Sequence, residues 1–64
     1  MVYSWRIGGK YYLYGIVYDV MDYLERNAGE CNIEEIIAFP SPDNEHDDFI
    51  MVVVSGCELG EEEQ

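Results

Sequence analysis

The sequence predicts an α+β fold, a single small domain with one helix packed on an antiparallel-rich sheet of three or four strands in the order ββαββ. Three patterns support this. Phe49 to Val54 is an unbroken apolar run, too continuous for a half-buried alternating strand and too short to span a membrane. Val2 to Ile7 and Lys10 to Tyr14 flank Gly8-Gly9 like the arms of a hairpin. Ile16 to Asn27 has the spacing of an amphipathic helix.

The first two strands are expected to pair through the glycine dipeptide, because Gly-Gly suits a two-residue turn with positive φ. In this hairpin Ile7 pairs with Lys10. Trp5 then lies opposite Tyr12, and the large apolar side chains of both strands gather on one face. An alternative βαββ order starts the helix at Lys10. Gly15 then lies inside the helix, where it lowers helix stability by about 1 kcal/mol relative to Ala.

The helix predicted over Ile16 to Asn27 has one apolar stripe and one acidic side. The stripe consists of Ile16, Val17, Val20, Met21 and Leu24. On the other side Asp22 precedes Arg26 by one turn, a spacing that favours an ion pair. The sequence offers no good capping residue before Ile16, so the start of the helix is left open.

Two further strands complete the expected sheet. Ile33 to Phe39 ends at Pro40, and Phe49 to Ser55 follows a polar loop as the central strand, with a neighbour on each side. Residues 1–57 are then the folded domain, and residues 58–64 an acidic, frayed tail.

The two cysteines, Cys31 and Cys57, lie just outside these strands. If the strands pair from their loop ends without a slip, Ile33 lies opposite Ser55. Cys31 then lies opposite Cys57, close enough for a disulfide. A slip of one residue would remove this pairing. Free thiols are the favoured state, because a reducing cytosol keeps cysteines unbonded.

The charge balance restricts the kind of partner. Three basic residues stand against fourteen acidic ones, a net charge of −11. Direct nucleic-acid binding is therefore excluded, since the chain has no basic patch to meet phosphates. A basic protein surface is the favoured partner, and simple solubility is the alternative. The sequence has no signal-peptide pattern and no membrane-spanning stretch, so we expect a cytoplasmic protein with no membrane partner.

Catalysis and metal binding find little support. Asp43, Glu45 and Asp47 have the spacing of a calcium loop, but Asp48 stands where that loop needs Gly and Val54 where it needs Glu. A single histidine, no nucleophile elbow and no phosphate loop indicate a protein that is not an enzyme and has no cofactor.

The expected function is inhibition by binding a basic nucleic-acid-binding protein, with carboxylates in place of phosphates. The predicted contacts are acidic residues of the helix and the loop, with two exposed tyrosines as apolar anchors: Asp19, Asp22, Glu25, Asp43, Glu45, Asp47, Asp48, Tyr18 and Tyr23. In size and charge the chain resembles phage-encoded inhibitors of host defence, such as anti-CRISPR and anti-restriction proteins. The alternative is a homo-oligomeric structural or regulatory module, for example a homodimer, with the acids serving solubility only.

Overall fold

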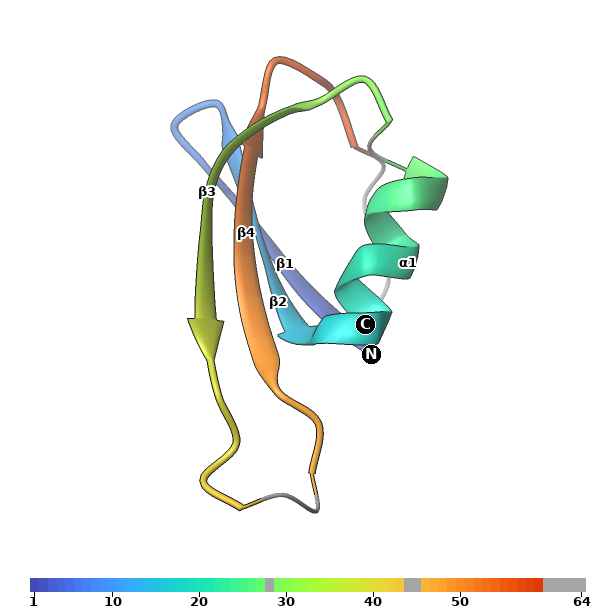
Figure 1. Cartoon of the computed structure of the whole chain (residues 1–64). Coiled ribbons are helices and arrows are strands. Elements are labelled where there is room, and N and C mark those ends of the chain that lie inside the picture. Colours follow the sequence, from blue (N-terminus) through green and yellow to red (C-terminus); the bar gives the residue numbers. More distant parts are fainter. Residues whose placement is uncertain (28, 44–45, 60–64) are drawn as a thin grey trace.

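The computed structural model describes residues 1–27, 29–43 and 46–59, and it shows one helix on one face of a four-stranded antiparallel sheet (Figure 1). The elements are β1 (Val2–Ile7), β2 (Lys10–Ile16), α1 (Val17–Asn27), β3 (Asn32–Phe39) and β4 (Phe49–Ser55). The predicted ββαββ order is confirmed. The βαββ alternative is wrong, because Lys10 begins a strand and not a helix.

The strand order in the sheet is β1-β2-β4-β3, so β4 has a neighbour on each side as its continuous apolar sequence predicts. Helix α1 packs against β2, β4 and β1. Over the described residues it does not come close to β3, which forms one edge of the sheet. The single helix therefore covers only part of one face.

The hairpin between β1 and β2 has the predicted register, with Ile7 paired to Lys10 and Trp5 paired to Tyr12. Gly8 and Gly9 have φ of 58° and 82°. Two successive residues with positive φ define the tight turn whose twist matches antiparallel strands. The glycine pair thus fixes which side chains of both strands share a face.

The hydrophobic core lies between α1 and the sheet. Its buried residues are Tyr11, Leu13, Val20, Ile50, Val52, Val54 and Leu59. Leu59 belongs to the segment predicted to be a frayed tail, but it is only 7% exposed and extends the core beyond residue 57. Met21 belongs to the predicted apolar stripe, but it is 58% exposed, because it lines an open groove beside the helix.

The helix begins one residue later than predicted. Ile16 belongs to β2, where it pairs with Phe49, and α1 starts at Val17. The N–H of Val17 donates to the backbone carbonyl of Asp48 at 3.0 Å. This contact from a distant part of the chain satisfies one of the free amides of the first turn, which explains why the local sequence has no capping residue.

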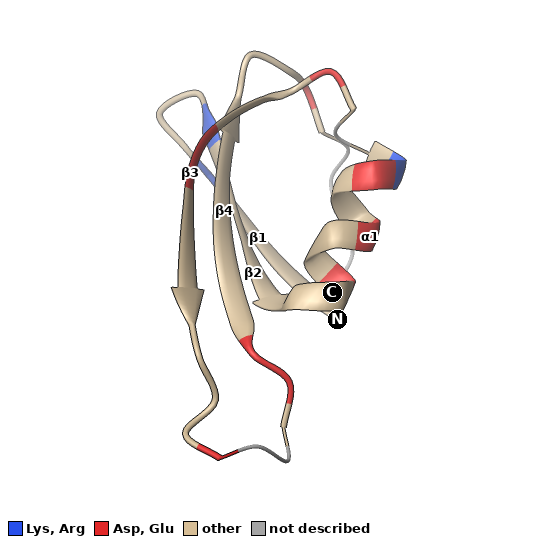
Figure 2. Cartoon of the chain, viewed as in Figure 1, with Lys and Arg blue, Asp and Glu red and all other residues tan. Residues whose placement is uncertain are grey.

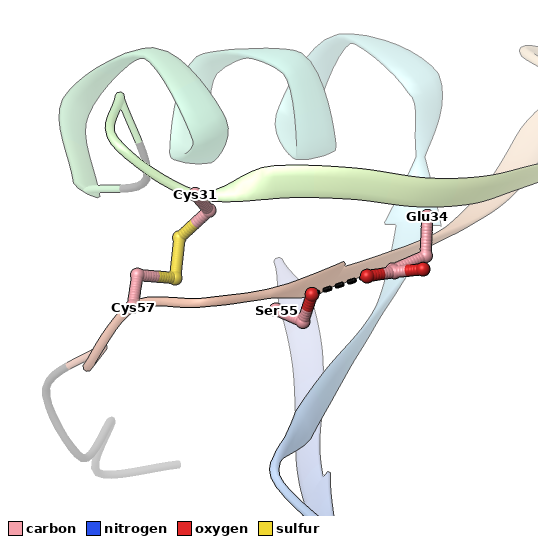
Figure 3. Close-up of a disulfide and its surroundings, with 4 residues drawn as sticks. All are labelled: Cys31, Glu34, Ser55 and Cys57. Atoms are coloured by element: carbon pink, nitrogen blue, oxygen red, sulfur yellow. Dashed lines mark hydrogen bonds between the residues drawn. A yellow bond between two sulfur atoms is a disulfide. The ribbon is translucent and has the colours of Figure 1, made fainter.

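The pairing of β3 with β4 departs from the predicted register at one point. Phe39 pairs with Phe49 as expected, but the register shifts by one residue between Glu35 and Ile33. Ile33 consequently pairs with Val54, so the predicted Ile33–Ser55 pair is wrong. The extra residue is Glu34, whose carboxylate accepts a hydrogen bond from the Ser55 hydroxyl (Figure 3).

The two cysteines form a disulfide despite this shift, with their Cα atoms 5.0 Å apart (Figure 3). The expectation of free thiols is therefore wrong for this structure, as is the expectation that a one-residue slip separates them. The chain leaves β4 at Gly56, where φ is 74°, a value suited to glycine. This turn brings Cys57 to Cys31 outside the strand pairing itself.

Candidate protein-binding surfaces

A groove of about 880 Å³ runs between α1 and β3, on the part of the sheet that the helix leaves uncovered. We call it the acidic groove. Its lining is apolar except for two carboxylates of the helix, and it consists of Val17, Tyr18, Met21, Asp22, Leu24, Glu25, Ile33, Ile36, Ile50 and Val52.

The walls of the acidic groove expose large apolar side chains. On the helix Tyr18 is 69% exposed and Met21 58%, and on β3 Ile33 is 57% exposed and Ile36 59%. Single exposed apolar residues are ordinary, but a continuous set that lines a groove is typical of a binding surface.

The helix supplies the carboxylates of this region, and Figure 2 shows the acidic positions in red along α1. Asp22 forms an ion pair with Arg26 at 3.1 Å, as its spacing predicts. Asp19 is paired with the N-terminal amino group of Met1. All these groups are substantially exposed, so the pairs are weak and open to exchange with other cations.

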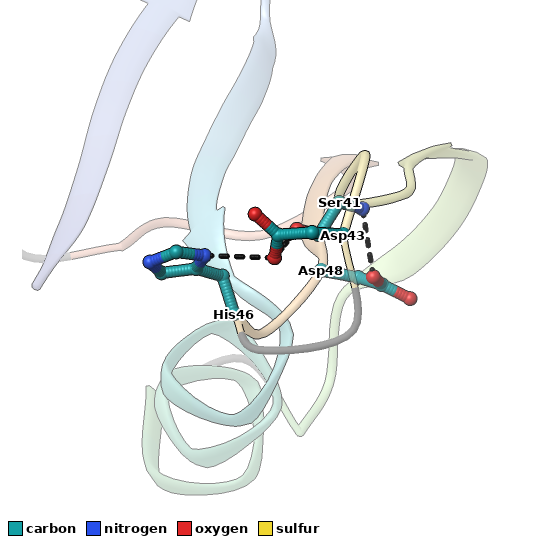
Figure 4. Close-up of polar contacts among 4 residues, drawn as sticks. All are labelled: Ser41, Asp43, His46 and Asp48. Atoms are coloured by element: carbon teal, nitrogen blue, oxygen red, sulfur yellow. Dashed lines mark hydrogen bonds and ion pairs between the residues drawn. The ribbon is translucent and has the colours of Figure 1, made fainter.

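The predicted loop carboxylates make contacts of their own (Figure 4). The carboxylate of Asp48 accepts a hydrogen bond from the backbone N–H of Ser41 at 2.9 Å and so closes the loop. His46 Nδ1 lies 2.9 Å from a carboxylate oxygen of Asp43. Glu45 lies outside the described residues. Asp48, predicted as a binding residue, therefore has a structural role in the loop.

The predicted contact residues do not form one surface. Asp43 and Asp47 line a separate hollow with the aromatic residues Tyr14, Phe39 and Phe49. The strand pairing places these aromatic residues on the sheet face opposite the helix, whereas the acidic groove is on the helix face. One flat partner surface therefore cannot cover both. Tyr23, expected as an exposed anchor, is half-buried against the core, and only Tyr18 is widely exposed.

The face of the sheet away from α1 is a second candidate surface, which we call the aromatic face. Strand pairing places its side chains in cross-strand rows, one of which is Tyr3, Tyr14, Met51 and Ile37, and the next Trp5, Tyr12, Val53 and Glu35. Tyr14 stacks on Phe49 and meets Phe39 edge to face, with ring centroids 5.5 and 5.9 Å apart. No described element covers this face.

The β3 side of the acidic groove could not be predicted from the sequence. Ile33, Ile36 and the neighbouring Ile37 do not alternate regularly with polar residues, so the pattern gave no indication of which face would be left open. The only available signal was the surplus of apolar residues over what so small a core can bury.

The structure also bears on metal binding and membrane insertion. Among the described residues, no group of three or more His, Cys, Asp or Glu is placed to hold a metal ion. Val54, which stands at the last ligand position of a calcium loop, is fully buried in β4. In the described part of the chain, no helix has the length and apolar character needed to cross a membrane.

Comparison of the chain with protein-family models, with curated proteins and with solved structures finds no match. The two surfaces are therefore the features of the molecule that bear on its function.

Proposed function

We propose that this protein is a small acidic inhibitor that binds a nucleic-acid-binding protein and occupies the basic surface where that partner holds DNA or RNA. It acts by competition and has no enzymatic activity. Its place of action is the cytoplasm, that of the host cell if the chain is viral, and the Cys31–Cys57 bond persists there only if it resists the cytosolic reductants. Phage inhibitors of host defence, of the anti-CRISPR or anti-restriction kind, are the class it fits best by size and charge.

The observation that supports this proposal is the composition of the acidic groove. Its floor is aliphatic, and Asp22 and Glu25 line it from the helix side. An apolar floor favours any partner with exposed aliphatic side chains, and the carboxylates select those that also carry Lys or Arg. The partner segment is therefore expected to be amphipathic and basic, as at the edge of a nucleic-acid-binding cleft.

The ion pairs within the chain do not oppose this binding. Asp22 already has Arg26 as a partner, and Asp19 has the N-terminal amino group. Exposed pairs of this kind contribute about 0–1 kcal/mol. An arginine of the partner that binds a carboxylate in a bidentate and less hydrated setting can replace them at little cost.

The net charge adds a long-range contribution. At −11, the whole molecule attracts a basic surface before contact and speeds the encounter at low salt. Charge alone would attract many basic proteins weakly, so the aliphatic floor of the groove is what makes one partner preferred. Specific binding should then need both the charges and the apolar groove.

The first test is affinity capture from a lysate of the source cell, or of its host, at low and at high salt. The result expected is one nucleic-acid-binding protein or complex, retained in stoichiometric amount and released by its own DNA or RNA. A double variant, Asp22→Asn with Glu25→Gln, should lose most of this retention. A matched variant, Asp47→Asn with Glu58→Gln, removes the same charge away from the groove and should retain the partner. Equal loss in both variants would mean that bulk charge is responsible and not the groove.

A homo-oligomeric module is the second candidate, and the uncovered aromatic face is the observation that favours it. A lysate that yields no retained protein, together with a stable oligomer in solution, would support this alternative over inhibition.

A further inference from the structure

We infer that the aromatic face is the contact between two copies of this chain, which associate sheet against sheet about a two-fold axis parallel to the strands. This inference does not depend on the proposed function. It places the acidic groove of each copy on the outer side of the dimer, because the groove and the aromatic face lie on opposite sides of one sheet.

The exposed apolar surface on this face is large. Trp5 is 48% exposed, Tyr3 47%, Ile7 62% and Phe39 43%. Four strands about 4.8 Å apart, each about six residues long, give a face about 20 Å wide and 20 Å long. Two such faces, taken as flat, present about 800 Å², and the relief of their side chains has to supply the rest of the roughly 1,000 Å² that a specific interface needs.

The distribution of charge restricts the occupant. A chain with a net charge of −11 pairs with itself most readily through the face that carries the fewest acids. The carboxylates of α1 lie on the other side of the sheet (Figure 2). On the described strands, the charged side chains of the aromatic face, Lys10, Glu34 and Glu35, lie in the two rows nearest one end. Beyond the other end, Asp43 and Asp47 border the face in the hollow beside Phe39 and Phe49.

The two halves of the face complement each other under this two-fold axis. The axis stacks β2 of one copy on β4 of the other, and β1 on β3, because the strand order is β1-β2-β4-β3. The β1–β2 half is aromatic along its middle rows, whereas the opposite half presents Met51 and Ile37, with Val53 buried between its neighbours. Tyr3 and Tyr14 of one copy therefore meet Ile37 and Met51 of the other, as in aligned sheet packing, while Trp5 lies over Glu35.

The charged end is complementary under the same operation. Lys10 pairs with Ser55 within the sheet, and the Ser55 hydroxyl donates to Glu34. Rotation about the axis keeps each row at its own height, so Lys10 of one copy faces Ser55 and Glu34 of the other. The dimer then has two Lys10–Glu34 contacts, one at each side of the axis. A second copy brings the matching charges itself, whereas an unrelated apolar partner would need a negative group for Lys10 and a positive group for Glu34.

The test uses the native protein and its single tryptophan, Trp5, which lies on this face. Sedimentation and fluorescence are followed as protein concentration rises. The expected result is a doubling of mass together with a shift of Trp5 emission to shorter wavelength, as the indole leaves water. Higher salt should increase the dimer fraction, since it screens repulsion between two acidic copies. A monomer at every concentration up to the millimolar range, or a dimer with unshifted Trp5 emission, would overturn the inference.

Two neighbouring residues of β3 provide a matched pair of variants, because Ile37 points to the aromatic face and Ile36 to the acidic groove. Ile37→Asp should weaken dimerisation at least about tenfold, and Ile36→Asp should leave it unchanged. A double reversal, Lys10→Glu with Glu34→Lys, should restore association that either single change reduces. Dimers that survive Ile37→Asp and are lost in Ile36→Asp would contradict the assignment. Salt also separates this dimer from partner capture, because capture by the groove should weaken as salt rises.

Discussion

The backbone carbonyl of Asp48 accepts a hydrogen bond from the N–H of Val17 at 3.0 Å, so the end of the loop between β3 and β4 caps the first turn of α1. The Asp48 side chain meanwhile holds the beginning of the same loop through the N–H of Ser41. One residue thus joins the loop to the helix that forms one wall of the acidic groove.

Asp48→Ala should lower the free energy of unfolding by about 1 kcal/mol, because the Ser41 amide loses its acceptor. Asp48→Asn keeps an oxygen at the same position and should recover most of that loss. Urea denaturation measures both. Asp47→Ala, a neighbouring exposed carboxylate, is the control and should change stability by less than about 0.5 kcal/mol. Equal effects of Asp48→Ala and Asp47→Ala would show that the loop contact does not matter for stability.

Gly15→Ala should destabilise the protein by about 1–3 kcal/mol, because the site is already filled. A Cβ at Gly15 would lie 2.7 Å from the backbone oxygen of Met1 and 3.4 Å from Val20 Cγ2. Gly29→Ala is the matched control, since a Cβ there meets nothing within 4 Å. Thermal or urea unfolding compares the two, and a neutral Gly15→Ala would mean that β1 and α1 can move apart without cost.

Reduction of the Cys31–Cys57 disulfide should lower the free energy of unfolding by about 3–4 kcal/mol, the chain-entropy estimate for a sequence separation of 26 residues. Urea unfolding with and without a reducing agent measures the change. The double variant Cys31→Ser with Cys57→Ser should have the stability of the reduced protein, and a reducing agent should not change it. If reductant shifts the variant as much as the wild type, the effect does not come from this bond.

The elements that could be predicted from the sequence are those fixed by local chemistry. The Gly8-Gly9 turn sets the β1–β2 register, and the continuous apolar run of β4 requires neighbours on both sides. The bulge at Glu34 was not predictable, because it depends on how β3 meets β4 and on the Ser55–Glu34 contact. Free thiols were expected from the reducing compartment, whereas formation of the disulfide depends on the turn at Gly56.

The candidate site was predicted only in part. The helix pattern correctly gave Asp22 and Glu25 as surface carboxylates, and both line the acidic groove. The pattern could not show that α1 lies over β1, β2 and β4 and leaves β3 bare, since that depends on the packing of the whole chain. Asp43 and Asp47 were grouped with the helix acids by charge, whereas the fold places them in a hollow with aromatic residues of the other face.

The central claim is that the acidic groove competes with nucleic acid for a basic partner, and competition on the captured partner tests it most directly. Labelled DNA or RNA is bound to that partner and then titrated with wild-type protein, with Ile36→Arg or with Ile37→Arg. Ile36→Arg adds a positive charge in the groove, and Ile37→Arg adds the same charge on the opposite face of β3. We predict that wild type releases the nucleic acid and that Ile36→Arg needs at least about tenfold more protein, while Ile37→Arg stays closer to wild type. Equal potency of Ile36→Arg and wild type, or no release by wild type, would contradict the claim.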